Sequence, residues 1–426
     1  MYKKIQDIDL SNKKVLLRCD FNVPIENNKI LDDNKILASL DTIKYLINQN
    51  CKIIILSHLG KVETEADKAK NSLAPVAERL RNIMNSKIIF VKQARGLLLE
   101  EKIDQMLPGE IMLLENTRFE DVPNKLESNN DSQLAEYWAE LADVFVMDAF
   151  GSAHRCHAST YGVAKLLPNC IGLLVQKELE TLEKYVFHPQ KPFTMMVGGA
   201  KVDEKIDLII KLVDNCDHLL LTGGIANSCL KVLGFNVGES LVTKDQAIID
   251  KLRQLLLNYK DKVMLPLDVI VGRSYDPTYV KYHTIDDLLV DDVISDIGLK
   301  TINKYKTAIN ESATVFINGT AGIYENDKFA IGTQELFNAV CDSKAIGIVG
   351  GGDSASAAKK FGLENKFDFV STGGGATLEY ILNGKLSALD AINKDAQWNK
   401  IAAVLLAFKI RIIIKRLVKF SNRFFI

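Results

Sequence analysis

The stretch GIVGGGDSASAAKKFG, residues 347–362, is the part of the sequence that decides the fold. A short apolar run is followed by three consecutive glycines and then by residues compatible with a helix. This order leaves free backbone N–H groups at a helix N-terminus, where the helix dipole favours an anion. Asp353 adds a carboxylate at the same place, and a carboxylate beside a phosphate needs a metal ion between them. The stretch therefore predicts a phosphate and metal site in an α/β fold.

Four further stretches repeat this order of apolar strand, glycines and turn or helix. They are residues 193–209, 218–235, 314–325 and 367–382. Loops at the carboxyl ends of strands in an open parallel sheet line one crevice, so several glycine-rich loops would let a polyphosphate lie against the backbone. Glycines that only make tight turns are the structural alternative for each loop. Neither a P-loop nor the fingerprint GxGxxG is present, which argues against a dinucleotide-dependent dehydrogenase.

Length and composition indicate a globular protein of two or three domains. The chain has 426 residues, of which 47% are hydrophobic and 25% charged,. A net charge of −1 gives no support for a nucleic-acid partner,. The seven cysteines include no CxxC pair and fit reduced thiols,. Because no apolar signal segment is visible at the N-terminus, we expect a cytoplasmic protein without stable membrane association.

The first half of the chain places polar side chains after predicted strands. Asp20 and Asn22 follow the strand predicted at 15–18, and the spacing of apolar residues predicts a helix over 32–47,. Six cations fall in loops or at helix starts, namely Lys35, His58, Lys61, Arg118, His154 and Arg155. If they converge, they make a site for a phosphate or carboxylate; solvated surface cations are the equally weighted alternative.

The chain resembles the phosphoglycerate kinases. The matching segments occur in the family's order and are RCDFNVP (18–24), SHLGK (57–61), SLAPVAERL (72–80), LLENTRF (113–119), DAFGSAHRCHAS (148–159), GGAKVDEKI (198–206), NGTAGIYE (318–325), GGGDSASAAKKFG (350–362) and STGGGATLE (371–379). The resemblance implies two Rossmann-like domains, each a mostly parallel sheet flanked by helices, joined by a hinge helix. The implied parts are a 3-phosphoglycerate-binding domain at 1–172, an interdomain helix at 173–188, a nucleotide-binding domain at 189–395 and an atypical basic and apolar tail at 396–426.

The activity that the resemblance implies is reversible phosphoryl transfer in glycolysis. ATP and the carboxylate of 3-phosphoglycerate give 1,3-bisphosphoglycerate and ADP, with magnesium as cofactor, in a monomeric cytoplasmic enzyme. A carboxylate is already ionised at neutral pH, so the reaction needs no general base. It needs positioning, positive charge around the transferred group and exclusion of water, which closure of two domains supplies.

The resemblance also assigns site residues. Those implied for 3-phosphoglycerate are Asp20, Phe21, Asn22, Lys35, His58, Leu59, Gly60, Lys61, Arg118 and Arg155. Those implied for the nucleotide are Gly199, Ala200, Lys201, Lys205, Gly223, Gly224, Asn318, Glu325, Gly351, Gly352, Asp353 and Ser354, with Asp353 also the magnesium ligand. The implied catalytic groups are Lys35, Lys201 and the loop Gly373, Gly374 and Gly375.

The sequence departs from the family in its loops and at its end. Lys35 and Lys61 stand where the family has arginine, and lysine lacks the planar fork that grips two oxygens. Thr320 and Ala321 replace residues of the family's WNGP-type loop, which we expect to loosen the nucleotide contacts. These changes leave open a catalytically weakened binding protein. The segment 401–426 carries lysines and arginines but no acid; we favour an altered, poorly packing tail over a segment with weak membrane-surface contact.

Overall fold

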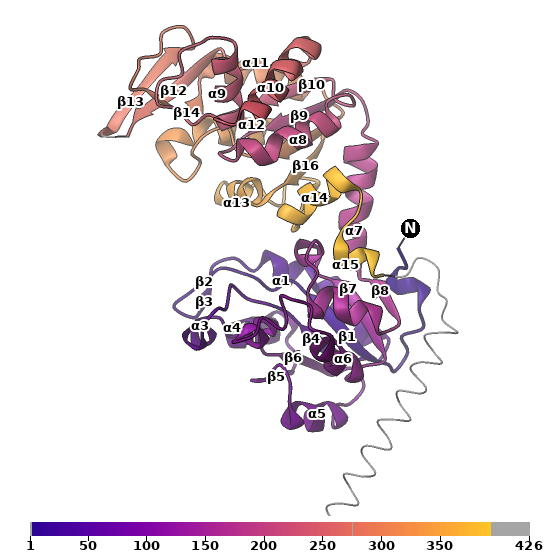
Figure 1. The fold of residues 1–426 in the computed structure, drawn as a ribbon. Coiled ribbons are helices and arrows are strands. Elements are labelled where there is room, and N and C mark those ends of the chain that lie inside the picture. Colours follow the sequence, from indigo (N-terminus) through magenta and orange to yellow (C-terminus); the bar gives the residue numbers. More distant parts are fainter. Residues whose placement is uncertain (1, 275, 393–426) are drawn as a thin grey trace, which may run out of the picture. The chain divides into compact units, whose positions relative to one another are not determined.

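The computed structural model describes residues 2–274 and 276–392, which form two compact units (Figure 1). Unit 1 comprises the described residues up to Gln176 together with 385–392, and unit 2 is Lys177–Gly384. Residues 385–392 were expected in the nucleotide-binding domain, but they belong to unit 1. The reason is local packing, since Leu386 and Leu389 are fully buried and the Ala388 N–H donates to the Ala153 carbonyl at 2.9 Å. The tail predicted at 396–426 lies outside the described residues.

Unit 1 is built on a six-stranded parallel sheet with the order β5-β6-β4-β1-β7-β8. Its strands are β1 (Lys14–Cys19), β4 (Lys52–Leu56), β5 (Ile88–Val91), β6 (Ile111–Leu114), β7 (Val144–Asp148) and β8 (Asn169–Ile171), and the short hairpin β2 (Ile25–Glu26) and β3 (Lys29–Ile30) lies outside the sheet. The central strands are apolar on both faces, as a parallel sheet covered by helices requires. The strand order reverses between β1 and β7, and ligands bind at such a switch point.

The helices of unit 1 follow the strands in an alternating α/β pattern. They are α1 (Asn34–Ala38), α2 (Leu40–Asn48), α3 (Glu65–Lys70), α4 (Ala74–Met84), α5 (Leu97–Asp104), α6 (Ser132–Glu140) and α15 (Ser387–Asp390), with short 3₁₀ or π turns η1 (Ile5–Asp7), η2 (Thr117–Asp121), η3 (Phe150–Ser152), η4 (Ala158–Gly162) and η5 (Val163–Lys165). The single helix predicted over 32–47 is two helices that meet at Ser39. The Ser39 N–H bonds to the Ile36 carbonyl and its hydroxyl to the Lys35 carbonyl, which tightens the last turn of α1,.

Unit 2 contains a second six-stranded parallel sheet, in the order β11-β10-β9-β15-β16-β17. Its strands are β9 (Phe193–Val197), β10 (His218–Leu221), β11 (Val263–Met264), β15 (Thr314–Asn318), β16 (Ile346–Gly350) and β17 (Phe369–Val370). The switch point here falls between β9 and β15. The parallel α/β architecture predicted for both domains is confirmed.

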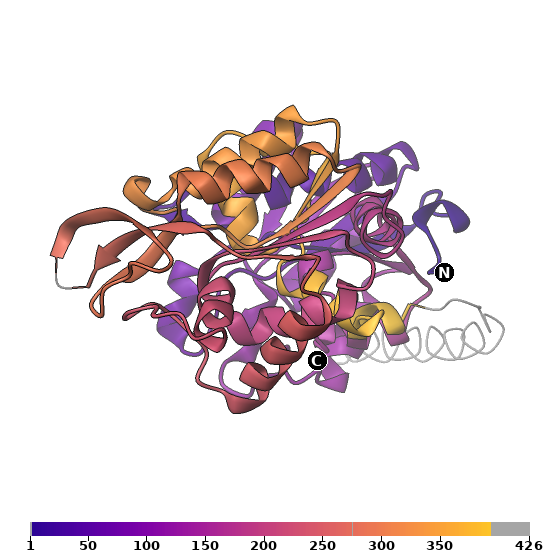
Figure 2. The same ribbon diagram turned by 90° about the horizontal axis from the view of Figure 1, so that it is seen from above.

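A three-stranded antiparallel sheet is the part of unit 2 that the sequence did not predict. It consists of β12 (Asp268–Arg273), β13 (Asp276–Thr284) and β14 (Val293–Ile297) in the order β13-β12-β14. Figures 1 and 2 show this ribbon projecting from one end of unit 2. All five residues of β14 line the candidate nucleotide pocket described below.

The helices of unit 2 cover its parallel sheet. They are α8 (Val202–Leu212), α9 (Gly223–Val232), α10 (Gln246–Asn258), α11 (Leu299–Asn310), α12 (Ile331–Asp342), α13 (Gly352–Lys360) and α14 (Gly375–Asn383), with a 3₁₀ turn η7 (Asp327–Phe329). One core of this unit is formed by β15, α11 and α12, around Ile317, Tyr305 and Phe337, all fully buried.

The chain passes from unit 1 to unit 2 within α7 (Leu173–Leu182), which continues into a π turn η6 (Glu183–Phe187). At its start, the buried Asp148 carboxylate accepts a hydrogen bond from the Leu174 N–H at 3.0 Å and so caps the helix,. Further along, buried Glu178 accepts hydrogen bonds from Ser371 and Thr372 of unit 2. All seven cysteines are unpaired, as expected for reduced thiols.

Candidate active site

Two loops at the carboxyl edge of the unit 1 sheet are tied together by predicted residues. Asp20 follows β1, and its carboxylate accepts the Asn22 N–H at 3.1 Å. The Asn22 side chain in turn accepts the Gly60 N–H at 2.8 Å, while the Phe21 N–H donates to the Ser57 hydroxyl. These hydrogen bonds hold residues 20–22, after β1, against residues 57–60, after β4. We call this edge beside the switch point the unit 1 rim.

Arginine and histidine side chains gather on this rim in a group that we call the unit 1 cation cluster, after the charge of its three arginines. Its members are Arg18, His58, Arg118, His154, Arg155 and His157. One Arg18 nitrogen lies 3.3 Å from His58 Nδ1, and Arg155 Nε lies 3.4 Å from His154 Nε2. Burial, followed by the repulsion of Arg118 and its cationic neighbours, lowers the pKa of His157 to about 3. Partly buried positive charge in excess makes this a site for an anion.

Lys35 contributes to the same rim through an ion pair. It lies in α1, and its ammonium is 3.0 Å from Asp20 Oδ2. Burial of Asp20 opposes its ionisation, but the attraction of Lys35 and His58 outweighs burial and holds its pKa below the usual value. Asp20 is therefore an ionised acceptor held in place by a lysine.

Lys61 is not brought to the cation cluster. Its side chain is 73% exposed and pairs with Glu63 at 2.8 Å. Gly60 turns the chain with a φ of +59°, and the next residue to enter the core is Val62, at 3% exposure. The lysine is thereby left on the outside of the loop.

Arg18 and His157 are cluster members that the sequence analysis did not assign. Arg18 is fully buried and its Nε donates to the Ser159 hydroxyl at 2.9 Å. An arginine inside an otherwise apolar parallel strand is a signal that could have found it, because buried arginines are rare unless they are paired. His157 carries no comparable signal in the sequence.

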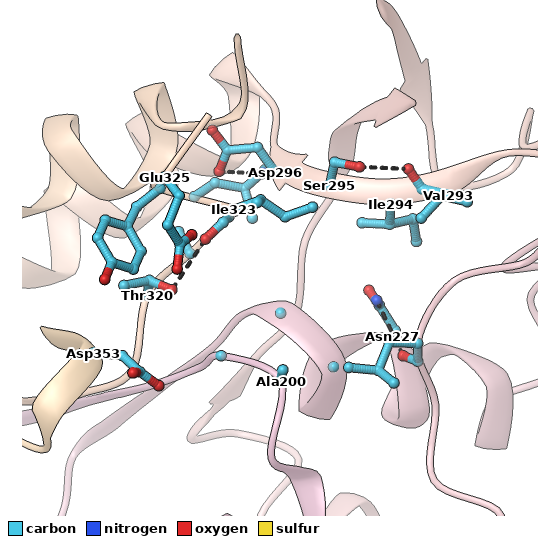
Figure 3. A pocket seen from close by; sticks show the side chains of 18 of the residues that line it. Ala200, Asn227, Val293, Ile294, Ser295, Asp296, Thr320, Ile323, Glu325 and Asp353 are labelled. Carbon is cyan, nitrogen blue, oxygen red and sulfur yellow. Dashed lines mark hydrogen bonds between the residues drawn. The ribbon is translucent and has the colours of Figure 1, made fainter. Parts of the chain in front are cut away.

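Unit 2 contains a cavity of about 340 Å³ at its switch point (Figure 3). Six predicted nucleotide-binding residues line it, namely Gly199, Ala200, Gly223, Gly224, Glu325 and Asp353. The opposite wall, which the sequence did not predict, comes from β14, including the buried acid Asp296, and from apolar side chains such as Ile294, Ile323 and Leu241. Glycine backbone on one side and apolar side chains on the other suit a flat ring system.

The three loops after β9, β10 and β15 pack backbone against backbone. The Gly199 N–H donates to the Thr320 carbonyl and the Gly224 N–H to the Gly199 carbonyl, both at 3.0 Å. A Cβ on Gly223 would lie 2.7 Å from Gly199 N, and one on Gly319, at φ +114°, would lie 2.0 Å from Gly198 O. Only glycine allows this approach.

Thr320 lies in the loop after β15, where the sequence departs from the family, and forms hydrogen bonds that hold this loop in place. Its hydroxyl donates to the Gly322 carbonyl at 3.0 Å, and its carbonyl accepts the Thr222 hydroxyl at 3.1 Å. Ala321 is 2% exposed, and its N–H bonds to the Thr333 hydroxyl. The substitutions in this loop are thus supported by hydrogen bonds to both neighbouring loops.

Asp353 and Glu325 place carboxylates at one end of the cavity (Figure 3). Asp353 lies in the first turn of α13 and is exposed. Within the described residues, no group of three or more His, Cys, Asp or Glu is arranged to hold a metal. A single exposed carboxylate at the start of a helix fits magnesium, which is commonly held by one or two carboxylates together with substrate phosphates.

Lys201, just before α8, and Lys205, within α8, differ in how far they are buried. Lys205 donates to the Asn318 side chain at the end of β15. Burial lowers its pKa to about 8, although Asp353 and Glu204 oppose the shift. Lys201 is 66% exposed and lies 3.6 Å from Glu204. Of the two predicted lysines, the structure therefore brings only Lys205 to the strand end.

The remaining predicted glycines and Ser354 shape two helix starts. Gly351, with φ +91°, precedes α13, and the buried Ser354 hydroxyl accepts the Gly319 N–H at 2.6 Å. Gly352 and Gly375 are the first residues of α13 and α14, and a Cβ on either would meet nothing within 4 Å. Gly373 donates to the Ser371 hydroxyl, and Gly374 has φ +52°. Both helix starts thus leave open backbone amides for an anion.

The fold and the two half-sites define a class of protein. Each of two parallel α/β sheets presents a candidate site at its switch point, one lined by arginines and the other by glycine backbone with an exposed carboxylate. This is the arrangement of a nucleotide-dependent kinase with a small anionic acceptor.

Comparison with known proteins identifies the family within that class. The chain belongs to the phosphoglycerate kinase family, whose sequence model matches residues 5–385. It is 44% identical to phosphoglycerate kinase of Onion yellows phytoplasma, over 92% of this chain and 100% of that one. Its identity to the enzyme of Enterococcus faecalis is also 44%, over 92% and 99%. The phosphoglycerate kinase structure from Coxiella burnetii superposes with a TM-score of 0.79 at 38% identity, covering 92% of this chain and 99% of that one.

Proposed function

We propose that this chain catalyses reversible transfer of the terminal phosphoryl group of ATP to the carboxylate of 3-phosphoglycerate, giving 1,3-bisphosphoglycerate and ADP. The observation that carries the proposal is the pairing of an anion-binding cation cluster with a glycine-lined pocket in a chain that matches the family over residues 5–385. The reaction places the protein in glycolysis and gluconeogenesis.

Unit 1 is proposed to bind 3-phosphoglycerate. Among the described residues, buried Arg118 Nε has no hydrogen-bond partner, so a donor is available to an incoming oxyanion,. Arg155 lies close enough to Arg118 to lower its pKa, after burial, and a shared phosphate or carboxylate would relieve that repulsion,. Asp20 and Asn22 are then placed to hold the glycerate part of the substrate.

Unit 2 is proposed to bind the nucleotide. The base would lie between the loops of Gly199 and Gly224 and the apolar side chains opposite, and Glu325 would accept the ribose hydroxyls,. Lys205 and the amides at the starts of α13 and α14 would receive the phosphates,. Asp353 would hold magnesium, which when bound supplies positive charge to the phosphate oxygens.

The chemistry that these residues perform is positioning and charge compensation. The acceptor carboxylate is ionised at neutral pH, so none of the histidines has to remove a proton. Lys35 and Lys205 would offset negative charge on the transferred group from the two half-sites. Because the acceptor and the phosphate must meet in line, we propose that the units close about α7 when both substrates are bound, which also excludes water.

The test is ATP turnover by the full chain in the presence of 3-phosphoglycerate. We expect ADP release that depends on 3-phosphoglycerate and magnesium and that is absent with glycerate, which lacks the phosphate. The alternative of a weakened binding protein predicts binding of both ligands by calorimetry without turnover, and that result would contradict the proposal.

We also propose that the enzyme is a cytoplasmic monomer that binds no nucleic acid and does not associate stably with membranes. The seven free cysteines support a reducing compartment,. None of the helices among the described residues combines the length and the apolar character that a membrane crossing requires. Sedimentation equilibrium measures the mass in solution, and a dimer at micromolar concentration would contradict this assignment.

A further inference from the structure

A buried carboxylate, Glu127, lies beneath the unit 1 cation cluster. It is 0% exposed and belongs to the loop between η2 and α6. The loop is held by Asp121, whose carboxylate accepts the Ser128 N–H at 2.7 Å and the Ser128 hydroxyl at 2.5 Å. The Glu127 carbonyl accepts the Ala158 N–H at 3.0 Å. Main chain and side chain of Glu127 are therefore both fixed.

Glu127 reaches the cation cluster through Ser159. Its two carboxylate oxygens accept the Ser159 N–H at 2.9 Å and the Ser159 hydroxyl at 2.5 Å. The Ser159 oxygen in turn accepts the Arg18 Nε–H at 2.9 Å, and another nitrogen of Arg18 lies 3.3 Å from His58 Nδ1. We call this chain of hydrogen bonds from Glu127 through Ser159 to Arg18 the relay. Because the Ser159 hydroxyl donates its proton to Glu127, a lone pair of its oxygen faces Arg18, which fixes the direction of each hydrogen bond in the relay.

Glu127 is also the main counter-charge of Arg18. Burial lowers the pKa of Arg18, and Glu127 is the strongest group acting against that shift. His157 Nδ1 lies 3.9 Å from the same carboxylate. A single buried acid thus compensates the charge of Arg18 on β1 and also lies close to the neutral His157 ring on the segment that follows Arg155.

We propose that Glu127 is a positioning residue for the substrate anion of unit 1. Through Ser159 it fixes the Arg18 guanidinium and, with it, the His58 ring and the 157–159 segment, so that the cation cluster is assembled before the anion arrives. This inference rests on the proposed function of unit 1 as the 3-phosphoglycerate site.

The negative charge of Glu127, taken alone, predicts the opposite effect on substrate affinity. A carboxylate near an anion site repels the anion, so removing its charge would tighten binding if Glu127 acted only through its charge. Loss of positioning would weaken binding instead. The sign of the change in affinity therefore separates the two roles.

The experiment compares Glu127→Gln with the wild type in steady-state kinetics. We expect the KM for 3-phosphoglycerate to rise about tenfold, as befits the loss of a hydrogen bond to a charged group, while the KM for ATP stays within about twofold. Ser159→Ala, which keeps the acid but cuts the relay, is expected to give the same split. Glu127→Asp keeps the charge but shortens its reach, so it should be impaired like Glu127→Gln.

The matched control is Glu120→Gln on the preceding turn, whose carboxylate is 2.7 Å from Arg95 and should leave both KM values unchanged. MgADP titration and thermal unfolding show whether each variant is folded; if Glu127→Gln is not, Ser159→Ala decides. Unchanged or tighter 3-phosphoglycerate binding in the folded variants would overturn the proposal. Failure of the wild type to bind 3-phosphoglycerate would instead overturn the proposed function.

Discussion

The two units share the topology of a six-stranded parallel sheet, but their candidate sites are lined by different kinds of chemical groups. Unit 1 lines its switch point with charged side chains, among them Arg18, Arg118 and Arg155, and compensates them with buried acids. Unit 2 lines its switch point with glycine backbone and uses few charged groups, chiefly Lys205 and Asp353. The topology therefore determines where a ligand binds, and the residues on the loops determine which ligand it is.

This difference predicts how a substitution in each site affects ligand affinity, rate and stability. A site made of side chains loses affinity or rate when one of them changes, while the fold persists. A site made of closely packed backbone has no room for a Cβ, so a substitution there disturbs the unit itself. The following variants test or sharpen the contrast.

The largest effect is expected in unit 1, for Lys35→Met. This change removes the ammonium 3.0 Å from Asp20 and leaves that acid unpaired. We expect kcat to fall by about 10²–10³-fold, below the full contribution of a transition-state arginine. The measurement is the steady-state rate with saturating substrates.

Lys61→Met is the matched control for Lys35→Met, because Lys61 is exposed and paired with Glu63. Its kcat should stay within about threefold of the wild type, since exposed ion pairs contribute little. Lys35→Arg should keep or raise the rate. Equal losses in Lys35→Met and Lys61→Met would contradict the placement of the two lysines.

In unit 2, Gly319→Ala is expected to act on stability first. Its Cβ would overlap Gly198 O, and its φ of +114° is unfavourable for alanine. The free energy of unfolding should fall by at least about 2 kcal/mol, with loss of MgADP binding. Urea unfolding and MgADP titration measure the two effects.

Gly352→Ala provides the comparison for Gly319→Ala, because its Cβ would meet nothing within 4 Å and its φ is not positive. Its unfolding free energy should lie within about 1 kcal/mol of the wild type. Binding of 3-phosphoglycerate at unit 1 should survive in both variants. Full stability of Gly319→Ala would show that the three loops are not packed as described.

Lys205 should make nucleotide affinity depend on pH. Its pKa of about 8 means that the free protein loses this positive charge as the pH rises above about 8. A bound phosphate favours the protonated lysine, so the Kd for MgADP should increase several-fold, roughly threefold to tenfold, between pH 7 and 9.5. Lys205→Met should be flat over this range, whereas Lys201→Met should keep the dependence. A flat wild-type profile would remove Lys205 from the site.

The last comparison concerns two buried acids, Asp148, which caps the start of α7, and Glu178, which lies within α7. Burial raises the pKa of Asp148 in unit 1 to about 8 and that of Glu178 in unit 2 to about 7. The folded protein holds these protons where the unfolded chain has released them, so the free energy of unfolding falls as the pH rises from about 4 toward each folded pKa. Asp148→Asn should remove the decline that ends near pH 8, and Glu178→Gln the decline that ends near pH 7. Urea titrations at half-unit steps of pH measure both, and identical slopes in wild type and variants would contradict the assignment.

The strands and the glycine loops could be predicted from sequence because both follow from local patterns. The runs at 88–91 and 346–349 are apolar and β-branched, and they form β5 and most of β16,. The glycine loops were recognisable because a phosphate site and a tight turn both require glycine at the end of a strand.

What the sequence did not predict depends on contacts between distant residues. Arg18 was taken as part of a strand, and its role appears only when Ser159 and Glu127, far along the chain, are brought beneath it. The exposed position of Lys61 follows from burial of Val62, and one wall of the candidate nucleotide pocket comes from β14, a strand that the sequence did not predict. Side-chain direction within a loop is not encoded in a short motif.

The return of residues 385–392 to unit 1 has a consequence for synthesis on the ribosome. The Ala153 carbonyl accepts its hydrogen bond from the Ala388 N–H, and the buried side chains of Leu386 and Leu389 belong to the same unit. At elongation rates of about 5–20 residues per second, the whole of Lys177–Gly384 is translated before these residues emerge,. Unit 1 therefore begins synthesis first but can complete its core only after unit 2 has been translated. A nascent chain released before residue 385 lacks part of the unit 1 core.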